Sequence, residues 1–208
     1  MKKLKKEKIR KINKSQLIRI GSFLIIIIGT IIVSNSLLSE YKNDKDNGQK
    51  IKEFFEVQEE IEVKEEIENV TEEVHYSSED YIGVLEIKKI NLYRGFYQKD
   101  SNLNNVNKNI KLLNESSMPD EEKGNVIFAS HSGNSYVSFF RNLPKLEIDD
   151  IATIYYGTET YNYKLVNTYE IEKTGTANIV RNKEVNTLTL ITCKHNTNKQ
   201  LVFIFEKI

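Results

Sequence analysis

Cysteine, proline and tryptophan are scarce in this 208-residue sequence. It contains one cysteine, two prolines and no tryptophan. A single cysteine cannot form an intramolecular disulfide, so a disulfide framework is excluded. An excess of charge of one sign is also lacking, because 30 Lys and Arg balance 30 Asp and Glu. The length suits one ordinary domain with attached segments.

The neutral total conceals three segments of different charge. Residues 1–19 carry nine basic side chains and one acid, residues 40–80 carry five basic and fifteen acidic side chains, and residues 81–208 carry sixteen and fourteen. This division predicts a basic tail, an acidic spacer and a folded domain of balanced charge.

Residues 20–38 form an uncharged apolar run, IGSFLIIIIGTIIVSNSLL. As a helix this run is about 28 Å long, close to the hydrocarbon thickness of a bilayer, so it predicts a transmembrane anchor. The preceding basic residues predict a cytoplasmic N-terminus and an extracytoplasmic remainder, that is, a single-pass type II protein. A cleaved signal peptide is the alternative, but the run exceeds a usual signal-peptide core and no clean small-x-small cleavage site precedes the spacer.

The flanking segments have two interpretations each. Residues 1–19 could form a nucleic-acid tail, but their position before an apolar run favours a topological role and attraction to membrane lipid, so no nucleic-acid partner is expected. Residues 39–80 are rich in Glu, with apolar residues partly at helical spacing. Sustained heptads are missing, so we expect a solvated extracytoplasmic spacer rather than a coiled coil.

Residues 81–208 contain short runs rich in Val, Ile, Thr, Tyr and Phe, which are typical of β-strands. They predict an all-β antiparallel barrel or sandwich, and seven or eight strands would close as a small barrel filled by side chains. Two runs separated by Thr158 and Glu159 predict a hairpin. Apolar spacing over Tyr136–Leu143, before Pro144, predicts a short helix. The strand-like runs are residues 81–87, 90–97, 125–130, 151–157, 160–171, 187–192 and 201–208.

The one thiol, Cys193, ends an apolar strand and opens the polar loop KHNTNK. Single cysteines are often buried and inert. A side chain at a strand end beside a loop can nevertheless meet a substrate. A nucleophilic thiol needs a partner that accepts its proton or favours the thiolate, and histidine is the usual one.

The sequence contains three histidines that are candidates for that partner. His75 lies in the acidic spacer, where we expect a solvated side chain. His131 follows the predicted strand at 125–130 and begins a polar turn. His195 lies two residues after Cys193, where the loop is expected to point its ring elsewhere. Position along the sequence favours His131 as the partner and leaves an inert thiol as the alternative.

At these residues the sequence resembles the sortases, the cysteine transpeptidases of Gram-positive cell surfaces. The resemblance covers residues 81–208, and its motifs are NVIFASHSG, FFRNLPKL and above all TLITC. It implies a closed eight-stranded β-barrel with short helices, with Cys193 as nucleophile and His131 as general acid. Cys193 would attack the Thr carbonyl of an LPxTG-like sorting signal in a surface protein. An amine of a cell-wall precursor or a pilin would resolve the thioacyl-enzyme, without a nucleotide, a cofactor or a metal.

The resemblance also implies an arginine near the start of the last strand, where it donates hydrogen bonds to the substrate or the oxyanion. No arginine follows Arg181 here, and Gln200 aligns with that position, with Lys199 before it. A glutamine amide donates without charge, and a lysine brings charge without the planar fork. Gln200 and Lys199 are both candidates for the catalytic site, and Arg181 is a weaker one. A non-catalytic or weakly active surface module on the same barrel is the alternative function.

Few features point to a subtype of this family. The only prolines are Pro119 and Pro144, which argues against the Asp-Pro lid of pilin-polymerising sortases. The connection at 171–187 is too short for the inserted helix of the haem-uptake type. Some members bind calcium, but the acids within 115–122 are expected to form a solvated loop. A papain-like protease is disfavoured because that group places its cysteine before its histidine.

Overall fold

The computed structural model describes residues 13–68 and 76–208, apart from the side chains of residues 64–68. The chain divides into two compact units, Met1–Ser39 and Glu40–Ile208. His75 and most of the basic tail lie outside the described residues. The domain boundaries expected at residues 19, 38 and 80 stay predictions.

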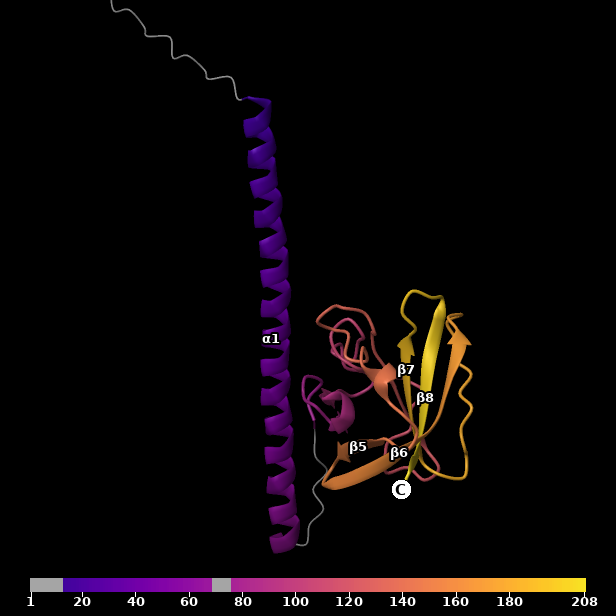
Figure 1. The fold of residues 1–208 in the computed structure, drawn as a ribbon. Coiled ribbons are helices and arrows are strands. Elements are labelled where there is room, and N and C mark those ends of the chain that lie inside the picture. The colour runs from indigo at the N-terminus through magenta and orange to yellow at the C-terminus, as the bar shows by residue number, and fades with distance from the viewer. Residues whose placement is uncertain (1–12, 69–75) are drawn as a thin grey trace, which may run out of the picture. The chain divides into compact units, whose positions relative to one another are not determined.

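Helix α1 is continuous from Lys14 to Glu68 (Figure 1). It contains the whole apolar run 20–38, whose large side chains are exposed. The helix is long and apolar enough to cross a membrane by length and composition. Its orientation across a membrane stays a prediction.

The part of α1 within the second unit differs from the solvated spacer that we expected. Its buried side chains follow one another at intervals of three or four residues, so they share one face of the helix. The apolar ones pack in a small cluster with Tyr81, Val84 and Tyr97. The acidic residues occupy the remaining faces, which made this stripe indistinct in the sequence. The buried residues are Asn47, Ile51, Phe54 and Gln58.

The rest of this unit is an eight-stranded sheet in the order β2-β1-β5-β6-β8-β7-β4-β3, which curls into a nearly closed barrel (Figure 1). Strands β4 and β7 are parallel, and the other neighbours are antiparallel. The predicted all-β barrel of about eight strands is confirmed. The elements are β1 Gly83–Ile87, 3-10 helix η1 Lys88–Ile90, β2 Leu92–Phe96, β3 Lys111–Leu112, β4 Asn125–Ala129, η2 Leu143–Lys145, β5 Ile151–Tyr156, β6 Glu159–Glu172, β7 Thr187–Cys193 and β8 Lys199–Lys207.

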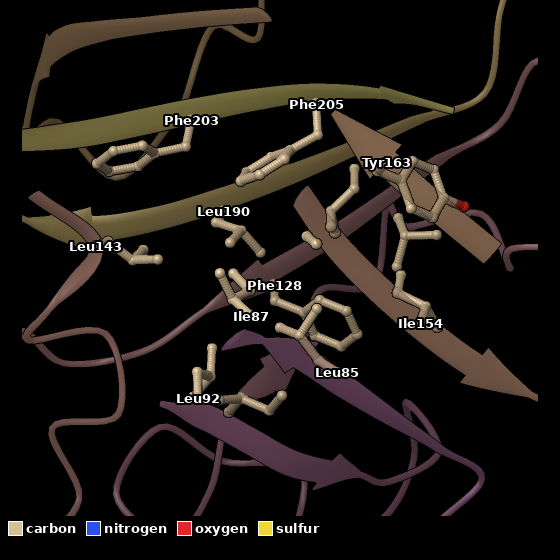
Figure 2. Packing of buried hydrophobic residues seen from close by; sticks show 14 of the residues in the cluster. Leu85, Ile87, Leu92, Phe128, Leu143, Ile154, Tyr163, Leu190, Phe203 and Phe205 are labelled. Carbon is tan, nitrogen blue, oxygen red and sulfur yellow. The ribbon is translucent and has the colours of Figure 1, made fainter. Parts of the chain in front are cut away.

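Every second side chain of the central strands fills the barrel. Figure 2 shows Phe128 of β4, Leu190 of β7 and Phe203 and Phe205 of β8 within one buried cluster. Because side chains alternate in direction along a strand, the residues between them lie on the outer face. This alternation decides which residues of the candidate site share a face.

Strands β5 and β6 form the predicted hairpin, with the turn one residue earlier than expected. Tyr156 pairs with Glu159, so the turn consists of Gly157 and Thr158. Gly157 has a φ of 57°. A glycine at the first position of a two-residue hairpin turn adopts such a value without strain.

The prediction of a short helix over Tyr136–Leu143 is wrong. Turns occupy this stretch, and they lead into the 3-10 helix η2. The Arg141 guanidinium donates to the carbonyl oxygens of Ser135, at 2.9 Å, and Ser138, at 3.1 Å. An α-helix would need these carbonyls for its own backbone bonds. The side chain therefore stabilises a compact loop in place of the helix.

Candidate active site

Cys193 is the last residue of β7 and is half-buried. Leu188 and Leu190 of the same strand lie in the barrel core. By alternation, Ile191 and Cys193 lie on the outer face. The thiol therefore stands at a strand end on the outside of the barrel rather than in its packed interior.

His131 lies two residues beyond β4, which runs parallel to β7. In this pair Ala129 lies opposite Ile191. Phe128 points into the core, so alternation places Ala129 on the outer face and directs the chain toward His131 on that same side. The histidine and the cysteine thus follow two adjacent strands at the same end of the sheet.

Three hydrogen bonds extend the β4 and β7 pairing past the end of β4. The backbone N–H of Ser130 donates to the carbonyl of Ile191 at 3.3 Å. The Thr192 hydroxyl donates to the carbonyl of Ser130 at 2.8 Å. The Ser132 hydroxyl donates to the carbonyl of Cys193. Both chain neighbours of His131 are therefore bound to the segment that carries the thiol.

Asn107 contacts the ring of His131. Its Oδ1 lies 3.1 Å from His131 Nε2. An amide oxygen only accepts hydrogen bonds, so Nε2 is the donor in this contact. The carbonyl of His131 accepts a further bond from the backbone N–H of Phe140 at 3.0 Å. Ring and backbone of His131 are thus held by separate segments.

Gln200 lies directly opposite Cys193 in the antiparallel pairing of β7 and β8. Phe203 and Phe205 of β8 point into the core. Gln200 therefore falls on the outer face, on the same side as the thiol. An amide at this position can donate a hydrogen bond to a group bound at Cys193.

Lys199 is engaged elsewhere. Its ammonium lies 3.4 Å from the Glu170 carboxylate, and Lys194 binds the other oxygen of that carboxylate. These hydrogen bonds, from Lys194 first and then from Lys199, hold the pKa of the Glu170 carboxyl below its usual value. Alternation along β8 also places Lys199 on the face opposite to Gln200.

Arg181 is not brought to the thiol. Its guanidinium donates to the carbonyls of Lys123, at 3.0 Å, and Asn182, at 3.1 Å. The carbonyl of Gly124, the next residue after Lys123, accepts from the N–H of Thr187, the first residue of β7. Because Cys193 is at the other end of this strand, about 20 Å separates the two positions.

The remaining sequence candidates stay apart from a defined site. His195 is exposed in the loop after β7. Glu121, within the acidic stretch, accepts a bond from the backbone N–H of Met118 at 2.6 Å. Within residues 13–68 and 76–208, no three His, Cys, Asp or Glu side chains are grouped to hold a metal ion.

A protein-family model described as a Sortase domain matches residues 85–206. The match covers more than half of the chain and includes His131, Cys193 and Gln200. The chain belongs to the sortase family. Members of this family are cysteine transpeptidases, and this sortase carries a thiol and an imidazole at the ends of two adjacent strands.

Solved sortase structures resemble this sortase over the barrel. A Clostridium perfringens Sortase D5 transpeptidase has a TM-score of 0.60 and 24% identity, over 78% of this chain and 98% of that chain. A Streptococcus suis sortaseC1 has a TM-score of 0.55 and 24% identity, over 62% and 73%. Listeria monocytogenes sortase A has a TM-score of 0.51 and 18% identity, over 62% and 87%. These likenesses show the fold, and comparison with curated proteins finds no match.

Two contacts of the site, those of Asn107 and Ser132, were not identified from the sequence. Asn107 lies in the run NLNNVNKN, where no pattern distinguishes one asparagine from the next. Ser132 directly follows His131, and its proximity to a candidate residue was the available signal. Both contacts are between segments that are distant in the sequence, so only the folded chain reveals them.

Proposed function

We propose that this sortase is a membrane-anchored cysteine transpeptidase that cleaves an LPxTG-like sorting signal and transfers the acyl group to an amine. The observation that carries the proposal is the position of its only thiol. Cys193 ends β7 on the outer face, and the segment around His131 is hydrogen-bonded alongside it. A half-buried thiol and a histidine at the ends of adjacent strands are the groups that nucleophilic catalysis needs.

In the first half of the reaction, the thiol proton of Cys193 passes to His131, and Sγ attacks the Thr carbonyl carbon of the sorting signal. The C–N bond to the following residue breaks, and His131 gives its proton to the departing amine. The product is a thioester between Cys193 and the N-terminal part of the signal. Because the thioester keeps the energy of the broken peptide bond, no nucleotide is needed.

In the second half, an acceptor amine attacks the thioester carbonyl. His131 takes a proton from the attacking nitrogen, and Cys193 leaves as a thiolate. Surface proteins with a C-terminal sorting signal are the proposed donors. A cell-wall precursor or another protein supplies the amine. The apolar helix would anchor the enzyme in the cell membrane, with the barrel outside the cell.

Gln200 is the proposed donor to the oxyanion that forms on the Thr carbonyl. Its position opposite Cys193 supports this role, and the binding of Lys199 to Glu170 argues against the lysine. A neutral amide stabilises an oxyanion by a hydrogen bond alone. We therefore expect turnover below that of a sortase with an arginine at this position.

A fluorogenic sorting-signal peptide mixed with an amine acceptor and the full chain tests the proposal. Turnover should depend on the amine and disappear in Cys193→Ala and His131→Gln. The control is His195→Gln, because this exposed histidine has no place in the site, and its turnover should equal that of the wild type. Turnover that persists in Cys193→Ala would refute the proposal.

The second candidate function is a non-catalytic surface module, favoured by the absence of an arginine at position 200. Such a module would bind the sorting peptide and leave it intact at high protein concentration. The same mixture separates the two functions, since peptide binding can be followed by fluorescence anisotropy with the peptide recovered unchanged. Saturable binding without cleavage would support the module.

A further inference from the structure

We infer that Arg94 is a positioning residue for His131, held in place by the Glu40–Asn47 part of α1. The inference rests on the catalytic role proposed for His131. Arg94 lies in the edge strand β2 and does not touch the histidine. It acts through two loops. In each loop, the residue that contacts Arg94 lies no more than two positions from the residue that contacts His131.

Arg94 is a buried cation, with 5% of its surface exposed. Its Nε donates to Asn109 Oδ1 at 2.7 Å. Its guanidinium carbon lies 4.0 Å from the centre of the Phe139 ring, a stacking geometry that arginine favours. One side chain thus joins the loop before β3 to the loop after His131.

The first connection to His131 passes through the loop before β3. Asn109 accepts from Arg94 and also donates to the carbonyl of Gly95 at 2.8 Å. These two hydrogen bonds to β2 fix the loop at Asn109. Two residues earlier in the same loop, Asn107 accepts a hydrogen bond from His131 Nε2. Because the loop is short between these points, its attachment to Arg94 sets the position of the Asn107 oxygen.

The second connection passes through the loop that follows His131. Phe139 stacks on Arg94, and the next residue, Phe140, donates its N–H to the carbonyl of His131. Phe140 is fully buried. Arg94 therefore fixes this loop at Phe139 and Phe140, and through the Phe140 hydrogen bond it fixes the backbone of His131.

Helix α1 holds Arg94 from the other side. Asn43 accepts a hydrogen bond from the guanidinium, and the carboxylate of Asp44 lies 3.9 Å from it. Asn47 accepts from the N–H of Gly95 at 3.3 Å and donates to the carbonyl of Tyr93 at 3.1 Å. These bonds cover the free edge of β2 with side chains of the helix.

A salt bridge makes a third contact between this part of α1 and the same loops. Glu40 lies 3.6 Å from the guanidinium of Arg141, which itself binds the carbonyls of Ser135 and Ser138. The helix thus reaches both Arg94 and the loop after His131. Through Arg94 and Arg141, the packing of α1 against the barrel is therefore coupled to the two loops that contact His131. One of these contacts is the hydrogen bond from His131 Nε2 to Asn107.

The test compares Asn43→Ala with Lys45→Ala in the full chain in detergent micelles. Lys45 is exposed on the same helix, which makes its variant the matched control. Hydrogen exchange by mass spectrometry reports on residues 103–110 and 131–142. Selective ¹⁵N labelling of the three histidines, with His131→Gln for assignment, reports which ring nitrogen of His131 is protonated.

In Asn43→Ala we expect faster exchange in these two loops alone, and an Nε2 signal of His131 that moves toward the mixture of tautomers of free histidine. The turnover number should fall roughly fivefold while KM for the peptide is unchanged. Lys45→Ala should match the wild type. Arg94→Lys keeps the charge and loses the planar guanidinium. It should show larger changes in loop exchange, in the His131 signal and in turnover number than Asn43→Ala.

Unchanged loop exchange and an unchanged His131 signal in Asn43→Ala would overturn the inference. Faster exchange throughout the barrel would also overturn it, because Arg94 would then be structural only. If Arg94→Lys does not fold, Asn43→Ala alone decides. Should the enzyme prove inactive on sorting peptides, the proposed function fails, while exchange and nitrogen signals still decide whether Arg94 positions His131.

Discussion

At the scale of single residues, the proposed site combines a thiol, an imidazole and a neutral amide. Cys193 and Gln200 are paired across β7 and β8, so a group bound to the sulfur lies within reach of the amide. From the sequence, Gln200, which aligns with the missing arginine, and Lys199, which precedes it, were both candidates for its role. The register of β8 separates them, since neighbours in a strand point to opposite faces.

Gln200→Ala should lower the turnover number roughly a hundredfold, the loss typical of one oxyanion donor. Lys199→Ala should change it less than twofold, because the lysine binds Glu170 rather than the substrate region. Steady-state kinetics with the fluorogenic peptide measure both. Equal and negligible effects would remove Gln200 from the site, and increased turnover in Gln200→Arg would support its position.

The lowered pKa of Glu170 predicts that the stability of the folded barrel depends on pH. Hydrogen bonds from Lys194 and Lys199 hold the pKa of its carboxyl below the usual 4.5. A lowered pKa in the folded state adds stability above the usual pKa, and this stability is lost as pH falls through the lowered value. The midpoint of thermal unfolding should therefore be higher in the wild type than in Glu170→Gln at neutral pH, and the difference should vanish well below 4.5. A difference that grows on acidification would contradict this sign.

At the scale of elements, strands rich in β-branched and aromatic residues were predictable, and their pairing was not. The runs at 125–130 and 187–192 became β4 and β7, but their parallel pairing joins residues some sixty positions apart. Strand β3 has only two residues and leaves no pattern. The loop at 136–143 follows its arginine and serine contacts rather than its apolar spacing.

Helix α1 is the element whose role the sequence did not reveal, and Phe54 tests it. This side chain is 3% exposed and packs with Tyr81, Val84 and Tyr97. Phe54→Ala should lower the free energy of unfolding of the barrel unit by about 3 kcal/mol. Val57→Ala is the control, because Val57 is exposed on the same helix. Chemical denaturation of the full chain measures both, and equal stabilities would show that the helix does not support the barrel.

At the scale of the whole molecule, the chain joins a sortase barrel to an apolar helix that could cross a membrane. The family was predictable because its motifs lie at the ends of β4 and β7, where short runs of sequence suffice. The contacts of Asn107 and Arg94 were not, since each depends on loops brought together by the closed sheet. The basic residues before the helix favour an external barrel.

The single cysteine gives a direct measurement of topology. In intact cells a membrane-impermeant maleimide should label Cys193, because the thiol is half-buried on the outer face of an external barrel. Cys193→Ala should abolish the label. Labelling that requires permeabilised cells would place the barrel in the cytoplasm and contradict the type II orientation.

The central claim is that Cys193 forms an acyl-enzyme with a sorting signal. Mass spectrometry of the intact chain, after mixing with a sorting-signal peptide without an acceptor, tests it most directly. We predict one adduct on Cys193, with the mass of the peptide up to its Thr, that disappears when an amine is added. A chain that keeps its unmodified mass while the peptide stays intact, or an adduct that persists in Cys193→Ala, would contradict the account.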